Sequence, residues 1–149
     1  MKKILTFIVN KNKQLLLLHN NPKDPIHGGD IWYTVTGGVE EYDDSLESAV
    51  IREVKEETNL DVITTKYLDI NYKYISRKGI ECNEYVFISL VDNGNIILNE
   101  ENIEYKWLDI NDYIKEIYWY SSKENLKEIL TNYFKGGLND WYRIFKKVL

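Results

Sequence analysis

The chain has 149 residues, 44% hydrophobic and 29% charged, a balance typical of one globular domain with a single core. The net charge of −5, without a basic block, argues against a nucleic acid polymer as partner. The single cysteine, Cys82, excludes an intrachain disulfide, and no apolar run reaches the roughly 20 residues of a membrane span. We therefore expect a cytoplasmic single domain over residues 1–149. Residues 137–149 form a C-terminal tail that could pack on its own domain or on a second copy in a homodimer.

The first part of the chain predicts β-structure. Residues 4–9 and 14–19 are two β-rich runs separated by a polar turn, which is the pattern of a hairpin. Residues 20–30 hold both prolines and Gly28-Gly29 and predict a loop. The aromatic and β-branched residues 31–36 predict one strand, which ends at Gly37-Gly38.

The clearest predicted helix covers residues 45–59. Asp44 or Ser45 can cap its start, and Asn59 can take the left-handed conformation that ends it. Further strands are predicted over residues 62–75, 84–91, 96–98 and 105–108, and further helices over 109–117 and 122–134. Strands on both sides of a central helix, followed by C-terminal helices, predict an α/β fold in which a mixed β-sheet is sandwiched between α-helices.

The helix over residues 45–59 carries carboxylates on the side that should be buried. On a helical wheel, Glu53 and Glu57 fall inside the apolar arc and Glu56 falls at its edge. Burying one unpaired carboxylate costs several kcal/mol, and three that converge repel one another. A divalent cation such as Mg²⁺ or Mn²⁺ removes both objections, because it prefers hard oxygen ligands. The alternative is a surface helix whose glutamates pair with lysines. The Gly-Gly segment and the helix N-terminus nearby favour a site.

The segment from Gly38 to Leu60 resembles the Nudix box, the motif of MutT-like hydrolases. The box reads Gly, five residues, Glu, seven residues, Arg-Glu, an aliphatic, any residue, Glu-Glu, any residue, Gly and an aliphatic. The matching positions are Gly38, Arg52, Glu53, Val54, Glu56, Glu57 and Leu60. Two positions depart from the pattern: Asp44 stands for the first Glu, with a shorter reach, and Asn59 stands for the last Gly.

The resemblance implies a metal-dependent hydrolase with Mg²⁺, or alternatively Mn²⁺, as cofactor. The implied metal ligands are the carbonyl of Gly37, the side chains of Glu53, Glu56 and Glu57, and a further glutamate for which Glu101 is the best match and Glu100 or Glu104 are fallbacks. Arg52 would orient a carboxylate, with Asp44 as one candidate. The general base would be Glu53, Glu57 or Glu101, and the sequence does not decide among them.

Residues 32–41 and 100–109 also resemble the dihydroneopterin triphosphate pyrophosphatase branch, in which Asn102 here stands for a His. This likeness implies hydrolysis of a diphosphate linkage in a nucleoside or pterin triphosphate, giving a monophosphate and pyrophosphate. Alternatives are a nucleotide-sensing module without catalysis, or a hydrolase of dinucleoside polyphosphates or nucleotide sugars. An isomerase and a decapping enzyme are further alternatives, although decapping would favour a basic groove.

Aromatic and basic residues near the box are candidates for substrate binding. Tyr72, Tyr74 and Arg77 lie in or near a predicted strand that could face a cleft, and Trp32 precedes the box strand. Their rings could stack on a base or a pterin, or they could be core residues.

Overall fold

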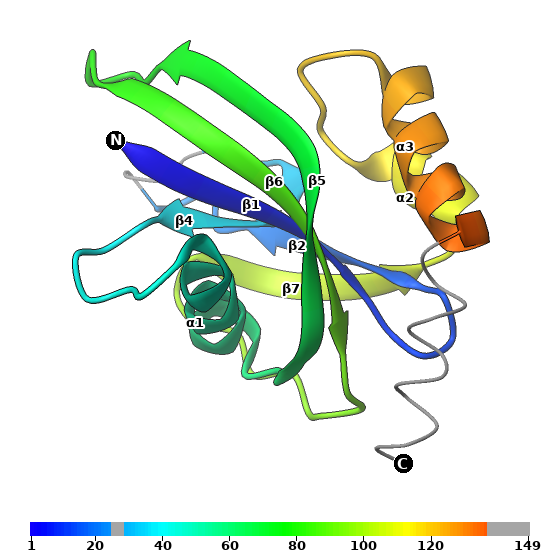
Figure 1. Cartoon of the computed structure of the whole chain (residues 1–149). Helices are drawn as coiled ribbons and strands as arrows, with labels where there is room; N and C mark the ends of the chain where they lie inside the picture. The colour runs from blue at the N-terminus through cyan, green and yellow to red at the C-terminus, as the bar shows by residue number, and fades with distance from the viewer. Residues whose placement is uncertain (25–28, 137–149) are drawn as a thin grey trace.

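The computed structural model describes residues 1–24 and 29–136, so the predicted tail over 137–149 and part of the predicted loop over 20–30 lie outside the described residues. The elements in chain order are β1 (Lys2–Val9), β2 (Leu15–Asn20), β3 (Trp32–Tyr33), β4 (Val35–Gly38), α1 (Leu46–Thr58), β5 (Val62–Ile75), β6 (Glu81–Val91), β7 (Asn102–Leu108), α2 (Ile110–Glu116) and α3 (Lys123–Gly136) (Figure 1).

The strands of the described residues form one mixed, seven-stranded sheet in the order β3-β2-β1-β6-β5, with β4 on β1 and β7 on β2. β1 runs parallel to β6 and antiparallel to β2 and β4. The register between β1 and β2 holds a single pair, Val9 with Leu15, after which the two strands diverge and take separate partners. Helix α1 covers one side of the sheet, and α2 and α3 cover the other (Figure 1). The predicted α/β/α fold is confirmed.

The strand predicted over residues 31–36 is two strands, so that prediction is wrong in detail. Trp32 and Tyr33 pair with β2, whereas Val35 pairs with β1. Because β1 and β2 diverge, the chain must cross from one to the other at Thr34. The Thr34 hydroxyl donates a hydrogen bond of 2.6 Å to the carbonyl of Thr6, which holds this crossing against β1.

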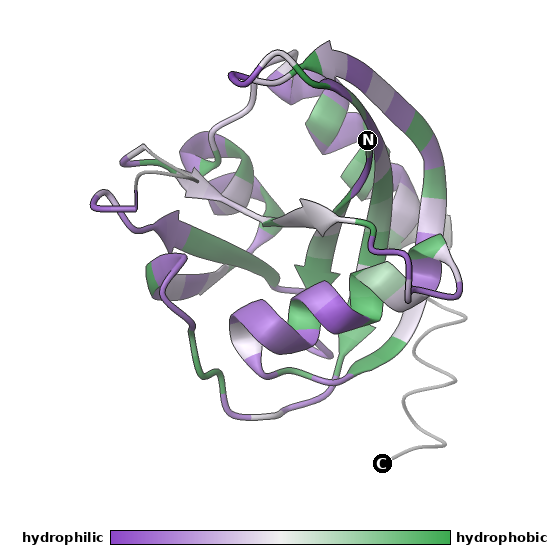
Figure 2. Cartoon of the chain, turned by 90° about the vertical axis from the view of Figure 1, so that its left-hand side faces the viewer, coloured by the Kyte–Doolittle hydropathy of each residue, from purple (hydrophilic) through white to green (hydrophobic). Residues whose placement is uncertain are grey.

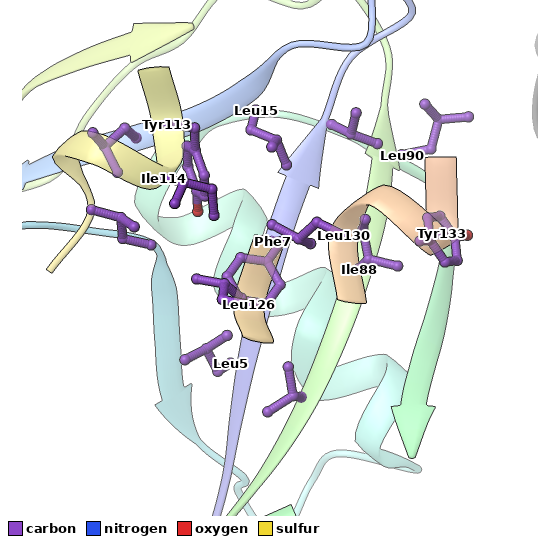
Figure 3. Packing of buried hydrophobic residues seen from close by; sticks show 14 residues of the cluster. Leu5, Phe7, Leu15, Ile88, Leu90, Tyr113, Ile114, Leu126, Leu130 and Tyr133 are labelled. Carbon is purple, nitrogen blue, oxygen red and sulfur yellow. The ribbon is translucent and has the colours of Figure 1, made fainter. Parts of the chain in front are cut away.

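Two apolar cores lie on opposite faces of the sheet. Alternation along β1 sends Ile4 and Ile8 toward α1, and Leu5 and Phe7 toward α2 and α3. Figure 3 shows the second core, in which Leu126 of α3 lies beside Phe7. Full burial of each such side chain contributes about 1.5–3 kcal/mol. In Figure 2 the middle of the sheet is largely green, whereas the long strand at its edge, β5, is banded purple and green, since its far end leaves the core.

The strand predicted over residues 96–98 is absent, and that prediction is wrong. Ile96 and Leu98 pack against the core under α1, while Ile97 is exposed. The Ile97 amide donates to the carbonyl of Thr58, at the end of α1, rather than to a neighbouring strand. The segment has the alternation of a strand without a strand partner. None of the described helices is long and apolar enough to cross a bilayer.

Candidate active site

Helix α1 begins and ends as its sequence predicts. The hydroxyl of Ser45, rather than the carboxylate of Asp44, caps the N-terminus and accepts from the amide of Ser48 at 3.0 Å. Asn59 ends the helix in the left-handed region with φ of 66°, and its amide donates to the carbonyl of Lys55. Asn therefore serves at the position where the box has Gly, because Asn tolerates positive φ better than most residues.

Arg52 fixes the loop that leads into α1. Its guanidinium binds both carboxylate oxygens of Asp43, at 3.0 and 2.9 Å, and donates at 2.9 Å to the carbonyl of Gly38. The suggestion that Arg52 orients Asp44 is therefore wrong, since Asp43 is the residue whose side chain turns toward Arg52. The pKa of Asp43 is lowered by its hydrogen bonds with Arg52, and the side chain is only 4% exposed. This bidentate pair holds the strand end and the helix together.

The carboxylate of Glu53 lies directly against the backbone of Gly37. A Cβ atom at Gly37 would stand 2.1 Å from the Glu53 carboxyl carbon and would displace that carboxylate, whereas one at Gly38 would meet nothing within 4 Å. Glu53 also accepts a 2.9 Å hydrogen bond from Arg52. Burial raises the pKa of Glu53 in spite of that arginine. The predicted proximity of Gly37 and Glu53 is therefore present.

Glu57 is the most deeply buried of the three box glutamates, at 5% exposed. One carboxylate oxygen accepts a long hydrogen bond of 3.4 Å from the amide of Asn102, and the other, Oε2, is buried without a partner. Burial, followed by repulsion from Glu101 and Glu53, raises the pKa of Glu57 well above its ordinary value. A buried anion held beside two others is the arrangement that a bound cation would relieve.

Glu101 approaches Glu57 from the other side of the cleft. Its amide donates to the side chain of Asn99, and its carbonyl accepts from the amide of Asn21, so the loop before β7 is tied to the end of β2. Glu56, by contrast, is 52% exposed and pairs with Arg52 at 3.3 Å. Among residues 1–24 and 29–136, no three His, Cys, Asp or Glu side chains form a group ready to hold one metal ion, and Arg52 engages two of the predicted ligands.

Two adjoining cavities form a cleft beside these carboxylates. The first, of about 370 Å³, is lined by Lys3, Asn20, Ile31, Tyr33, Thr34, Thr36, Glu57, Tyr74, Arg77, Glu101 and Asn102. The second, of about 420 Å³, is lined by Lys3, Ile31, Tyr33, Thr36, Tyr72, Lys73, Tyr74, Glu84, Tyr118 and Tyr120. Five lining residues are common to both cavities, so the cleft is continuous, and its size suits a small ligand. One end is acidic and the other is aromatic.

The predicted substrate-binding residues are divided by the structure. Arg77 lines the first cavity and Tyr72 the second. Trp32 lines neither: its ring stacks on His19 at 4.6 Å, and the amine of Lys106 lies 4.3 Å from its centroid. Asn102 and Glu84 also line the cleft, and neither was predicted from the sequence as a site residue. The departure from the family's His at Asn102 was the one available signal, since nothing local marks Glu84.

The fold and the cleft define an α/β domain whose central helix carries one carboxylate, Glu57, to the wall of a cleft large enough for a small molecule. A family model for the NUDIX domain matches residues 2–128. The chain belongs to the Nudix family, whose hydrolases generally use divalent metal ions.

Relatives from several branches of the family resemble the chain. Dihydroneopterin triphosphate diphosphatase from Escherichia coli is 27% identical over 120 residues, covering 71% of this chain and 76% of that protein. NAD-capped RNA hydrolase NudC from Actinobacillus succinogenes is 30% identical over 112 residues, covering 73% of this chain. The chain spans 40% of the length of NudC and 42% of that of Nudix hydrolase 5 from Arabidopsis thaliana.

Solved structures agree with this assignment. A Nudix-type protein from Listeria monocytogenes has a TM-score of 0.74 at 23% identity, covering 92% of this chain and 96% of that one. The E. coli dihydroneopterin triphosphate pyrophosphohydrolase has a TM-score of 0.69 at 25% identity, covering 88% and 95%. These relatives include a dihydroneopterin triphosphate pyrophosphohydrolase and an NAD-capped RNA hydrolase, so their substrates differ from one another.

Proposed function

We propose that the protein hydrolyses a diphosphate linkage in a small nucleoside-triphosphate-like molecule, giving a monophosphate and pyrophosphate, with Mg²⁺ as cofactor. The observation that carries the proposal is Glu57, whose buried Oε2 receives no hydrogen bond from a donor at the wall of the first cavity, where its carboxyl group meets that of Glu101. Burying an oxygen without a hydrogen bond costs free energy unless a bound ligand interacts with it. The relatives that cleave triphosphates support the same reaction class.

The donor set fits a hard divalent cation. Glu53, Glu57 and Glu101 with the carbonyl of Gly37 would hold it, all through oxygen. Glu56 would join by leaving its exposed pair with Arg52. When bound, the cation neutralises phosphate oxygens and lowers the pKa of water. The contact between Gly37 and Glu53 supports this set, because it places the Glu53 carboxylate directly against the backbone of Gly37.

The chain itself supplies proton transfer and positioning. Glu57 and Glu101 both line the first cavity, so either can take the proton of the attacking water. Glu53 is already engaged by Arg52 and is the weaker candidate for a base. Lys3 and Arg77 line the same cavity as the only Lys and Arg among its lining residues, where they can bind the leaving phosphates.

The aromatic end of the cleft supports a ligand with a planar ring, whether a nucleobase or a pterin. The residues of this end are Tyr33, Tyr72, Tyr74, Tyr118 and Tyr120. The likeness to the E. coli enzyme supports dihydroneopterin triphosphate as one member of the substrate panel. The net charge of −5 supports a small molecule over an RNA chain.

The test is a hydrolysis panel with Mg²⁺ over nucleoside triphosphates, dihydroneopterin triphosphate, nucleotide sugars and dinucleoside polyphosphates. Phosphate is measured with and without added inorganic pyrophosphatase, because pyrophosphate becomes visible only with it. We expect a coupled signal with one triphosphate class and a signal at least about a hundredfold weaker from Glu57→Gln. Tight binding without any hydrolysis across the panel would instead make the protein a nucleotide sensor.

A further inference from the structure

A buried carboxylate stands at the aromatic end of the cleft, away from the box glutamates. Glu84 lies on β6 in register with Lys3 of β1, and both residues line the second cavity. Glu84 is only 4% exposed. Among the described side chains, the one that donates to it is the hydroxyl of Tyr74, at a long 3.4 Å. The carboxylate therefore has capacity to accept stronger donors.

The rings around Glu84 are placed to hold a flat ligand over it. The amide of Tyr118 donates to the carbonyl of Trp32 at 2.8 Å, which fixes the loop between α2 and α3 beside β3. Tyr118 and Tyr120 are 53% and 52% exposed, although they line a cavity. Tyr120 meets Tyr72 edge to face at 5.3 Å. Half-exposed tyrosines around a buried acid provide aromatic surfaces for stacking, and the carboxylate of Glu84 provides a hydrogen-bond acceptor beside them.

We propose that Glu84 is a specificity residue that binds the 2-amino-4-oxo edge shared by pterin and guanine rings. That edge presents two adjacent N–H donors, and a carboxylate presents two adjacent acceptors, so the two pair in a bidentate manner. Adenine presents a donor beside an acceptor on the corresponding edge, and its acceptor would face a carboxylate oxygen. The inference rests on the proposed function only for the placement of the phosphates at the acidic end.

Lys3 explains how one ligand can reach both ends. Its side chain lines the two cavities, as do those of Tyr33 and Tyr74. A ligand whose ring binds at Glu84 can therefore extend past Lys3 into the cavity that Glu57 and Glu101 line. Burial raises the pKa of Glu84, and the charge of Lys3 opposes that shift. Lys3 thus favours the ionised, accepting form of the carboxylate.

The experiment measures equilibrium binding, which needs no turnover. Wild-type protein is titrated with GMP, neopterin monophosphate and AMP, alongside Glu84→Gln and the control Glu81→Gln. Glu81 is an exposed acid on the same strand, so its variant makes the same charge change without touching the cleft. We expect GMP, neopterin monophosphate or both to bind roughly tenfold or more tighter than AMP, as one good bidentate contact allows.

The Gln variant separates recognition from structural support. A Gln side chain offers one acceptor and one donor, which suits adenine, so Glu84→Gln should lose most of the preference and gain affinity for AMP. Equal binding of AMP by the wild type, or an equal loss for all three ligands in Glu84→Gln, would overturn the proposal. Glu84→Asp keeps the charge and should keep a weakened preference, which provides a second test if the Gln variant folds poorly.

The outcomes also separate this proposal from the proposed function. Selective binding of GMP or neopterin monophosphate with no hydrolysis of any triphosphate would refute the hydrolase while supporting Glu84. Hydrolysis that is equally fast with ATP and GTP, together with unselective binding, would refute the role of Glu84 and leave the hydrolase standing. Binding of one ring and not the other would identify which source of the shared edge the protein accepts.

Discussion

The two ends of the cleft are built in opposite ways. At the acidic end the box glutamates come from one helix, α1, in which Arg52 joins the preceding loop at Asp43, and Glu53 packs on Gly37. The aromatic end is assembled from β1, β3, β5, β6 and the loop after α2, which are distant in sequence. Local geometry therefore fixes the chemistry, whereas tertiary packing decides which ring is accepted. Changes at the two ends should separate into effects on turnover and effects on substrate choice.

The largest expected effect is at the acidic end, in Glu57→Gln. Loss of one carboxylate that would hold the cation should lower kcat/KM by about 10²–10³, since each 1.36 kcal/mol of lost transition-state stabilisation lowers the rate tenfold. Melting temperature should not fall, because the change removes an unpaired buried charge. Glu47→Gln, an exposed acid in the first turn of the same helix, is the matched control. Wild-type turnover in Glu57→Gln would contradict the assignment.

Gly37→Ala tests whether the strand end and Glu53 work as a unit. The added Cβ would displace the Glu53 carboxylate, so we expect activity or metal affinity to fall by about 10–100-fold, as for other groups that orient ligands. Gly38→Ala, one residue along, adds a methyl group to open space and should remain near wild type. Steady-state kinetics at several Mg²⁺ concentrations would measure both. Equal losses in the two variants would mean that any change in this loop is harmful.

Tyr118→Ala tests the aromatic end. Loss of one stacking ring should raise KM by about tenfold with little change in kcat, since base stacking on an aromatic is worth about 1–3 kcal/mol. Tyr105→Ala is the control, because Tyr105 is similarly exposed on β7 but lines neither cavity of the cleft. A loss confined to kcat in Tyr118→Ala would place that ring at the chemistry instead of at recognition.

The smallest effect concerns the loop that leads into α1. Arg52 lowers the pKa of Asp43, so this pair stabilises the fold above the ordinary Asp pKa of about 3.9 and is lost as pH falls through the lowered value. Asp43→Asn should therefore melt about 2–4 °C lower at pH 7 and converge on the wild type in acid. Melting curves from pH 7 to pH 3 would measure this. A difference that stays constant with pH would contradict it.

The sequence predicts the acidic end well and the aromatic end poorly, for a physical reason. Helical periodicity places Glu53 and Glu57 inward because both lie on one helix. The structure confirms that both side chains are largely buried. Glu56, at the edge of the arc, is exposed and bound to Arg52. Local spacing could not choose between Asp43 and Asp44, because the loop conformation decides which of them turns inward.

Long-range pairing accounts for what sequence reasoning missed in the rest of the molecule. The division of the strand at Thr34 follows from the divergence of β1 and β2, which no local pattern encodes. Glu84 lies in the cleft because β6 pairs in parallel with β1, a contact across about eighty residues of chain. Trp32 has the composition of a ligand-stacking residue, but strand pairing turns it toward His19.

The most direct test of the account is the effect of Mg²⁺ on thermal stability in wild type and in Glu57→Gln. If Glu57 completes a cation site, Mg²⁺ at a hundredfold excess over its Kd should raise the wild-type Tm by about 5–10 °C. The rise should be retained in Glu47→Gln and largely lost in Glu57→Gln. An equal rise in all three proteins, or none in the wild type, would contradict the claim that the buried carboxylate holds a divalent ion.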